Sequence, residues 1–329
     1  MLWADNPVCN SAQRRSMDRV RVSIATDADD HAANLTGWKQ AYDQLAPGRF
    51  RGTVRELWLG SQLQIFEETT SHAVRQSCEV WKGAFWFGIP VGEGPPGRIG
   101  LRALERRDIA VRPGGIEFEL MTPSSFRILG LVVEKQLLLN YIAEMEQTTL
   151  PPSVLDCEIL HTRDAERKGL EDILLPLFQH GPRLDRKQAR DALRDALLAV
   201  ITSNCITGLP PEIPSLTYTG RHRLVQRVRD FALAHKDEPL SIPQLCRAFH
   251  VSRRTLQYAF HEVSGISPGT YLRTLRMNGV RRALRAPQRP TIDVQDLAAQ
   301  WGFWNPSQFA CDYKKLFGER PSDTLLRRS

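Results

Sequence analysis

The chain has 329 residues, of which 42% are hydrophobic and 25% charged. These proportions are typical of a globular protein with two or three domains, and they exclude a disordered or collagen-like chain. No run of eighteen apolar residues predicts a membrane span, and the polar opening of the chain lacks the apolar core of a secretory signal.

The net charge of +7 is unevenly distributed. Residues 221–329 hold 19 Lys and Arg against 9 Asp and Glu, whereas the other 220 residues hold 25 against 28. A basic C-terminal segment on a slightly acidic body favours a polyanion as the partner of that segment, although a solvated basic surface would leave the same pattern.

Six cysteines are scattered singly along the chain, and no Cys-x-x-Cys pair is present. This spacing argues against zinc ribbons and thioredoxin-like redox chemistry. We therefore expect a reduced, cytoplasmic protein.

In chain order, residues 1–35 are expected to form a flexible N-terminus. Residues 36–206 then form one domain, with strands in about 50–133 and helices in about 134–206. Short apolar segments such as "LQIFEE" and "GAFWFGI", separated by Gly/Pro turns, predict a sandwich or a small, cupin-like β-barrel. The later segments have helical spacing. Three prolines and two glycines in 207–220 indicate a linker, so the expected fold class is α+β.

Five aromatic residues of the strand region are candidates for the wall of a ligand pocket. In "GAFWFGI" the side chains of a strand alternate, so Phe85 and Phe87 share one face and Trp86 takes the other. A barrel core and an apolar pocket wall predict the same composition, and both interpretations stay open. The candidates are Trp58, Trp81, Phe85, Trp86 and Phe87.

Residues 221–329 carry one helical pattern twice. In the first copy, a helix around 242–249 is followed by a break at His250 and by a second helix that starts at Ser252. In the second copy, Gly302 makes the turn and Asn305 caps the helix that begins at Pro306. A connecting helix begins near Pro268. Two helix-turn-helix units in tandem, with matching turn positions, are a much stronger signal than one.

These stretches resemble the DNA-binding domain of the AraC/XylS family of bacterial transcription regulators. The resemblance rests on "LCRAFHVSRRTLQYAFHEVSGISPGTYLRTLRMNGVRRAL" and "DLAAQWGFWNPSQFACDYKKLFGERPSDTLLRR". Tyr313 and the pair Cys311-Asp312 depart from the family pattern. The run "WKQAYDQLAPGRFRGTVRELWLGSQLQIFEE" resembles regulators of the ethanolamine-utilisation type. The resemblance implies an effector-sensing, dimerising N-terminal domain and a C-terminal domain that binds promoter DNA and recruits RNA polymerase.

Polar residues on the two second helices are the candidate DNA contacts. Arg can pair with guanine and Gln with adenine, whereas the two lysines near the end of the last helix suit phosphates. Each of these residues could instead belong to a solvated face of a core helix. The candidates are Ser252, Arg253, Arg254, Gln257, His261, Asn305, Ser307, Gln308, Asp312, Lys314 and Lys315.

Enzyme functions find little support. Residues 50–133 contain a single histidine, His72, which is too few ligands for a catalytic cupin metal site. No cysteine lies in the Pro-Cys-His-Arg setting of alkylation-repair proteins. We expect no catalytic site, no metal and no cofactor. The resemblance implies a homodimeric, nucleoid-associated transcription regulator, an activator controlled by a small organic effector. The alternative is a regulator controlled by a protein partner or by its abundance.

Overall fold

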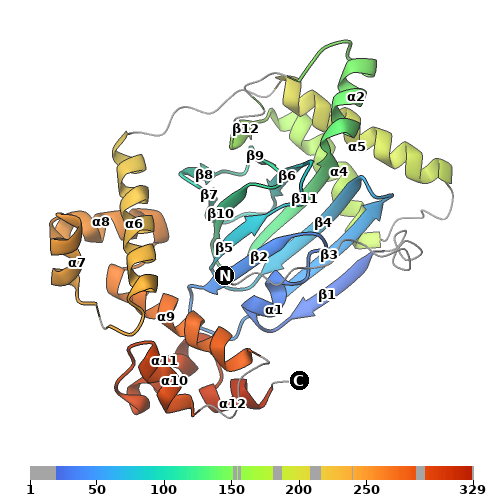
Figure 1. Ribbon diagram of the computed structural model, residues 1–329. Helices are drawn as coiled ribbons and strands as arrows, with labels where there is room; N and C mark the ends of the chain where they lie inside the picture. The colour runs from blue at the N-terminus through green and yellow to red at the C-terminus, as the bar shows by residue number, and fades with distance from the viewer. Residues whose placement is uncertain are drawn as a thin grey trace. The chain divides into compact units, whose positions relative to one another are not determined.

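The computed structural model of the chain describes residues 20–150, 154, 157–180, 187–207, 216–238, 240–286 and 293–327. The chain divides into two compact units. Unit 1 comprises Met1–Tyr42 and Arg51–Glu212, and unit 2 comprises Asp43–Phe50 and Ile213–Ser329. Unit 1 combines strands with helices and unit 2 is helical, as the expected α+β class requires (Figure 1).

Antiparallel strands build two sheets in unit 1. The larger sheet has the order β1-β3-β4-β11-β6-β9-β12, and the smaller has the order β2-β5-β10-β7-β8. The strands are β1 (Arg21–Ala25), β2 (Lys39–Gln44), β3 (Gly52–Leu59), β4 (Leu63–Thr70), β5 (Val74–Glu79), β6 (Ala84–Pro90), β7 (Gly97–Ile99), β8 (Arg102–Leu104), β9 (Asp108–Pro113), β10 (Glu117–Thr122), β11 (Phe126–Glu134) and β12 (Ile159–His161).

The two sheets pack face to face as a sandwich. Trp86 on β6 of the larger sheet stacks on Phe118 of β10 in the smaller one, with ring centroids 5.0 Å apart. Among the described residues each strand order runs from one edge to the other without closing, so the expected barrel is corrected to a sandwich. The physical reason is that the edge strands, including β1 and β12, pair only within their own sheet.

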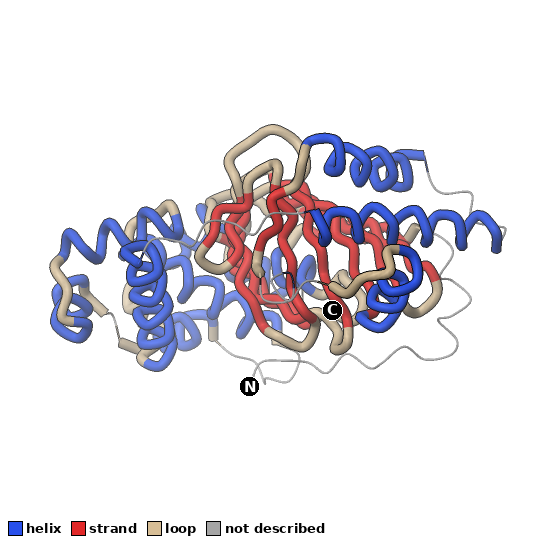
Figure 2. Tube along the Cα trace, turned by 90° about the horizontal axis from the view of Figure 1, so that it is seen from above, coloured by secondary structure: helices blue, strands red, loops and turns tan. Residues whose placement is uncertain are grey.

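Helices cover the other face of the larger sheet (Figure 1, Figure 2). They are α2 (Lys135–Met145), α4 (Asp164–His180) and α5 (Lys187–Thr207). Their apolar stripes, including Leu138, Leu174 and Ile201, join Phe85 and Phe87 in one buried cluster. The alternation predicted for "GAFWFGI" is confirmed, because Phe85 and Phe87 face these helices while Trp86 faces the second sheet.

The predicted boundary of the flexible N-terminus, residue 35, lies too far along the chain. Residues 1–19 lie outside the described residues, but β1 and the short helix α1 (Ala28–Ala32) occupy the remainder. Ala25, His31 and Leu35 are buried there, with exposed fractions of 6% or less. The segment is ordered because β1 pairs with β3 along its whole length.

Unit 2 is a helical domain arranged around one long central helix. Most residues of α9 are buried, and α6, α8, α10 and α12 pack directly on it. The helices are α6 (Leu216–Ala234), α7 (Ile242–Phe249), α8 (Arg253–Ser264), α9 (Pro268–Arg285), α10 (Val294–Gln300), α11 (Pro306–Phe317) and α12 (Pro321–Leu326). Helix α6 begins inside the predicted linker 207–220, of which residues 208–215 lie outside the described residues.

The turns of both helix-turn-helix units have the predicted geometry. His250 ends α7 in the left-handed conformation with φ of 53°, and Gly302 takes φ of 75° between α10 and α11. The side chain of Ser252 accepts from the Thr255 amide, and the Asn305 side chain accepts from the Gln308 amide, each at 3.0 Å. The predicted N-cap of α11 is therefore confirmed, and α8 has an equivalent cap at Ser252, where the sequence placed the start of that helix.

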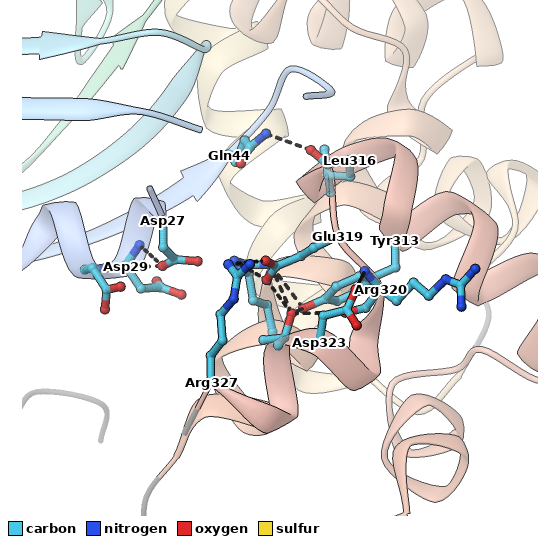
Figure 3. A network of polar contacts seen from close by, with 12 residues as sticks. Asp27, Asp29, Gln44, Tyr313, Leu316, Glu319, Arg320, Asp323 and Arg327 are labelled. Atoms are coloured by element: carbon cyan, nitrogen blue, oxygen red, sulfur yellow. Dashed lines mark hydrogen bonds and ion pairs between the residues drawn. The ribbon is translucent and has the colours of Figure 1, made fainter. Parts of the chain in front are cut away.

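A short stretch from far upstream belongs to unit 2. The Gln44 amide and carbonyl both bond to the Asn278 side chain on α9 at 3.0 Å, and the Gln44 side chain donates to the Leu316 carbonyl at 2.7 Å (Figure 3). Gly48 donates to the same carbonyl at 3.0 Å, and Asp43 pairs with Arg282 at 2.7 Å. Residues 43–50 thus satisfy a carbonyl in the last turn of α11 that its own helix leaves without a partner.

Candidate DNA-binding surface

Helix α8 exposes the polar face predicted from the sequence. Arg253, Arg254, Gln257 and His261 are all exposed, and so is the N-cap Ser252. On the opposite side of α8, three apolar side chains are buried: Leu256, Phe260 and Val263. The helix therefore has one apolar face in the core and one polar face in water, as a recognition helix requires.

An aromatic residue that the sequence analysis did not select also lies on this face. The ring of Tyr258 is 53% exposed, and the Arg254 guanidinium lies over it at 5.3 Å. The same guanidinium donates to the Tyr258 hydroxyl at 3.3 Å. Their spacing of four residues, which places side chains side by side on a helix, was the signal available in the sequence.

Helix α11 presents a second exposed polar face. Ser307, Gln308, Lys314 and Lys315 are exposed, as is the N-cap Asn305. The two lysines lie in the last turn of α11, where their charge also favours the negative end of the helix dipole.

Asp312 is the least accessible candidate on α11. Its carboxylate accepts from the Gln308 side chain at 3.0 Å and from the Arg273 guanidinium on α9. The side chain of Asp312 is only 22% exposed. The geometry therefore favours a role for Asp312 in orienting Gln308. Its partner Arg273 is a further cation beside this surface, and it was not among the candidates predicted from the sequence.

A buried polar network fixes α11 against α9 and α12. Burial raises the pKa of Tyr313 to about 12, and its hydroxyl contacts Thr324 at 2.9 Å and Arg281 at 3.3 Å. Glu319 pairs with Arg281 at 2.9 Å and with Arg327 at 2.6 Å (Figure 3). These contacts hold the second recognition helix at a defined angle on the central helix.

The five pocket candidates in unit 1 do not come together. Phe85 and Phe87 belong to the core beneath the helices, and Trp58 stacks on Trp81 with centroids 6.2 Å apart. Of the five, only Trp86 lines the cavity between the sheets. The proposed pocket wall is corrected accordingly, because alternate residues of one strand face opposite sides of a sheet.

The cavity between the sheets is small and combines aromatic with polar side chains. Its volume is about 10 Å³, which is about enough for one water molecule. Its polar lining includes Gln40, Gln76 and Glu68. The Glu68 carboxylate lies 2.9 Å from His31 and accepts from the Tyr42 hydroxyl at 2.8 Å. Its aromatic walls are Trp38, Phe66, Trp86 and Phe118.

No helix in the described part of the chain is both long and apolar enough to cross a membrane. No group of three or more His, Cys, Asp or Glu side chains that could hold a metal ion occurs among these residues.

Comparisons with known proteins centre on unit 2. A family model described as a helix-turn-helix domain matches residues 245–327. The probable thc operon regulatory protein of Rhodococcus erythropolis is 34% identical over 102 residues, and the chain spans 31% of the length of that relative. A solved structure, a probable AraC family transcriptional regulator from Rhodopseudomonas palustris, is 32% identical over 32% of this chain and 97% of that one, with a TM-score of 0.31.

One relative matches most of the chain. The XylDLEGF operon transcriptional activator 1 of Pseudomonas putida is 28% identical over 82% of this chain and 94% of its own length. The C-terminal part of the chain therefore carries a helix-turn-helix domain, and the chain is similar to transcription activators of the AraC/XylS type.

Proposed function

We propose that the chain is an effector-controlled transcription activator. In this proposal α8 and α11 read operator DNA, and unit 1 binds a small organic molecule. The observation that carries the DNA-reading role is the pair of capped helices with exposed polar faces. Helix α8 packs on α9, and α11 shares a buried apolar cluster with α9. The excess of positive charge in residues 221–329 supports it, because a polyanion is attracted to such a segment.

Within this proposal the candidate contacts have two kinds of task. The guanidinium of Arg254 and the amides of Gln257 and Gln308 can read base edges, because they bond in pairs to guanine or adenine. Lys314 and Lys315 contact phosphates, which adds affinity without sequence information. The tandem arrangement predicts that the helices enter successive major grooves about 10 base pairs apart.

Footprinting on an operator selected from random DNA tests the DNA-reading role. The expected result is two protected elements per protomer, about one helical turn apart, on one side of the duplex. A single short protected element would contradict the tandem use of α8 and α11.

The effector site is proposed to lie between the sheets of unit 1. Aromatic walls beside a few converging polar groups are typical of small-molecule sites. Since the cavity holds about 10 Å³, a ligand has to displace Trp86 or Phe118 to enter. The Glu68 carboxylate disfavours anions there, so a neutral or cationic metabolite fits better than a phosphorylated one.

Calorimetry of the full chain against neutral, cationic and anionic metabolites, followed by transcription assays, tests this part. Binding of a neutral or cationic compound that increases transcription supports an effector-controlled activator. In the proposal this activator forms a homodimer and recruits RNA polymerase. If no compound binds while transcription follows protein abundance or a protein partner, the ligand-independent alternative holds instead.

A further inference from the structure

Trp304 is an apolar side chain left in water beside a recognition helix. It is 67% exposed, whereas Trp38 and Trp86 in unit 1 are 5% and 2% exposed. It lies between α10 and α11, immediately before the N-cap Asn305. Scattered apolar residues on a surface are ordinary, but a tryptophan exposes more apolar area than any other side chain and is seldom left uncovered.

The packing of the turn explains why Trp304 has no place in the core. A residue just before an N-cap often packs against the fourth residue of the helix, which here is Phe309. Phe303 takes that position instead, with its ring centroid 5.0 Å from the Phe309 ring. None of the ring contacts identified in the described residues includes Trp304.

A cationic hollow adjoins Trp304 on the same surface. It measures about 310 Å³, and its lining includes Arg273, Arg276, Asn305 and Gln308 as well as Trp304. Arg276 is 8% exposed; its guanidinium donates to the Glu238 carbonyl, while its Nε has no hydrogen-bond partner among the residues that the structure describes. Burial lowers the pKa of Arg276, because its guanidinium is partly removed from water. An anionic partner would favour its charged form.

We propose that Trp304 is a specificity-determining residue that contacts a thymine methyl group in the major groove. The inference rests on the proposed DNA-reading function of α11. The first residues of a recognition helix meet base edges, and Trp304 lies two residues before α11 begins at Pro306. The only apolar group on a base edge in the major groove is the thymine methyl. Arg273 pairs with Asp312 but remains 48% exposed, so it can supply charge for a neighbouring phosphate while the indole contributes apolar contact.

A thymine-to-deoxyuridine substitution tests the contact, because it removes one methyl group and leaves base pairing unchanged. Each thymine of the selected operator is replaced in turn, and binding is measured with the full-length parent chain and with Trp304→Ala. Replacement of one particular thymine by deoxyuridine should lower the affinity of the parent about fourfold, which is the effect expected from removing one buried methyl group. Trp304→Ala should bind the unmodified operator about tenfold more weakly and lose nothing further at that thymine.

Leu326→Ala provides the matched control, because Leu326 is also a large exposed apolar residue, at 82%, on α12 of the same unit. It should bind the operator like the parent. Both variants should melt at the temperature of the parent, since neither side chain lies in the core.

Three outcomes would overturn the inference. If Trp304→Ala binds the operator with the affinity of the parent, the indole has no role in DNA binding. Equal losses on operator and random DNA would assign it to the sugar–phosphate backbone. A loss of transcription with unchanged DNA binding would assign it to a protein partner. If the parent chain itself has no preferred sequence, the proposed function fails first.

Discussion

Asn278→Ala should release residues 43–50 from unit 2. Asn278 is 2% exposed, and its side chain satisfies both the amide and the carbonyl of Gln44 at 3.0 Å. Alanine leaves these two buried backbone groups without hydrogen-bond partners, and each lost partner destabilises the closed segment by about 1–3 kcal/mol. Allowing for partial relaxation, the free energy for opening this segment should fall by about 2–4 kcal/mol.

Hydrogen exchange followed by mass spectrometry measures this effect directly. A loss of about 2–4 kcal/mol speeds exchange of the Gln44 and Gly48 amides by roughly 30- to 1,000-fold. Asn140→Ala is the matched control, because Asn140 is exposed on α2 and its loss should change stability by less than about 0.5 kcal/mol. Unchanged exchange in residues 43–50 of Asn278→Ala would refute the claim that this amide holds the segment.

The remaining predictions concern contacts, the cavity, a turn and alkaline stability. In binding titrations, Arg254→Ala should lose about 1–3 kcal/mol of binding free energy on the operator and much less on random DNA. Lys315→Ala should weaken binding to both DNAs alike and lower the slope of log affinity against log salt concentration by about one. An equal effect of Arg254→Ala on both DNAs would contradict its base-reading role. Trp86→Leu should bind operator normally but need more effector in transcription assays, and a parent-like response would place the effector site elsewhere. His250→Gly should stabilise the chain by about 0.5–1 kcal/mol in thermal unfolding, because φ of 53° strains a residue with a Cβ; a destabilised variant would mean that the imidazole makes a needed contact. The pKa of Tyr313 is raised to about 12, so its contribution to the free energy of unfolding is complete below pH 10 and is lost as pH rises from 10 to 12. Tyr313→Phe should therefore flatten the alkaline decline of the free energy of unfolding when unfolding is measured against pH. An equally steep decline in the variant would exclude Tyr313 as its source.

The sequence allowed local structure to be predicted well where a single residue imposes a backbone geometry. Gly302, Asn305 and Pro306 each restrict a turn or a helix start, and all three occupy the predicted positions. Alternation along a strand likewise separated Trp86 from Phe85, although it did not reveal which face would border a cavity.

Features that depend on distant pairing were missed. Strand β1 was not predicted because its pattern is weak and its order comes from pairing with β3. The contact between Gln44 and Asn278 spans 234 residues, and no local pattern reports such a separation. The exposure of Trp304 depended on which of two neighbouring aromatics packs on Phe309, and composition alone does not decide that.

The membership of residues 43–50 in unit 2 has a consequence for how the domain forms during synthesis. A ribosome releases the N-terminal residues first, so these eight residues leave it long before α9 and α11. The helices of unit 2 can form locally as they emerge, but their final contacts require closure of a loop of more than two hundred residues. A chimera that joins residues 213–329 to another sensor would lack residues 43–50. Water would then have to supply the hydrogen-bond partners that Gln44 and Gly48 give to the Asn278 side chain and the Leu316 carbonyl.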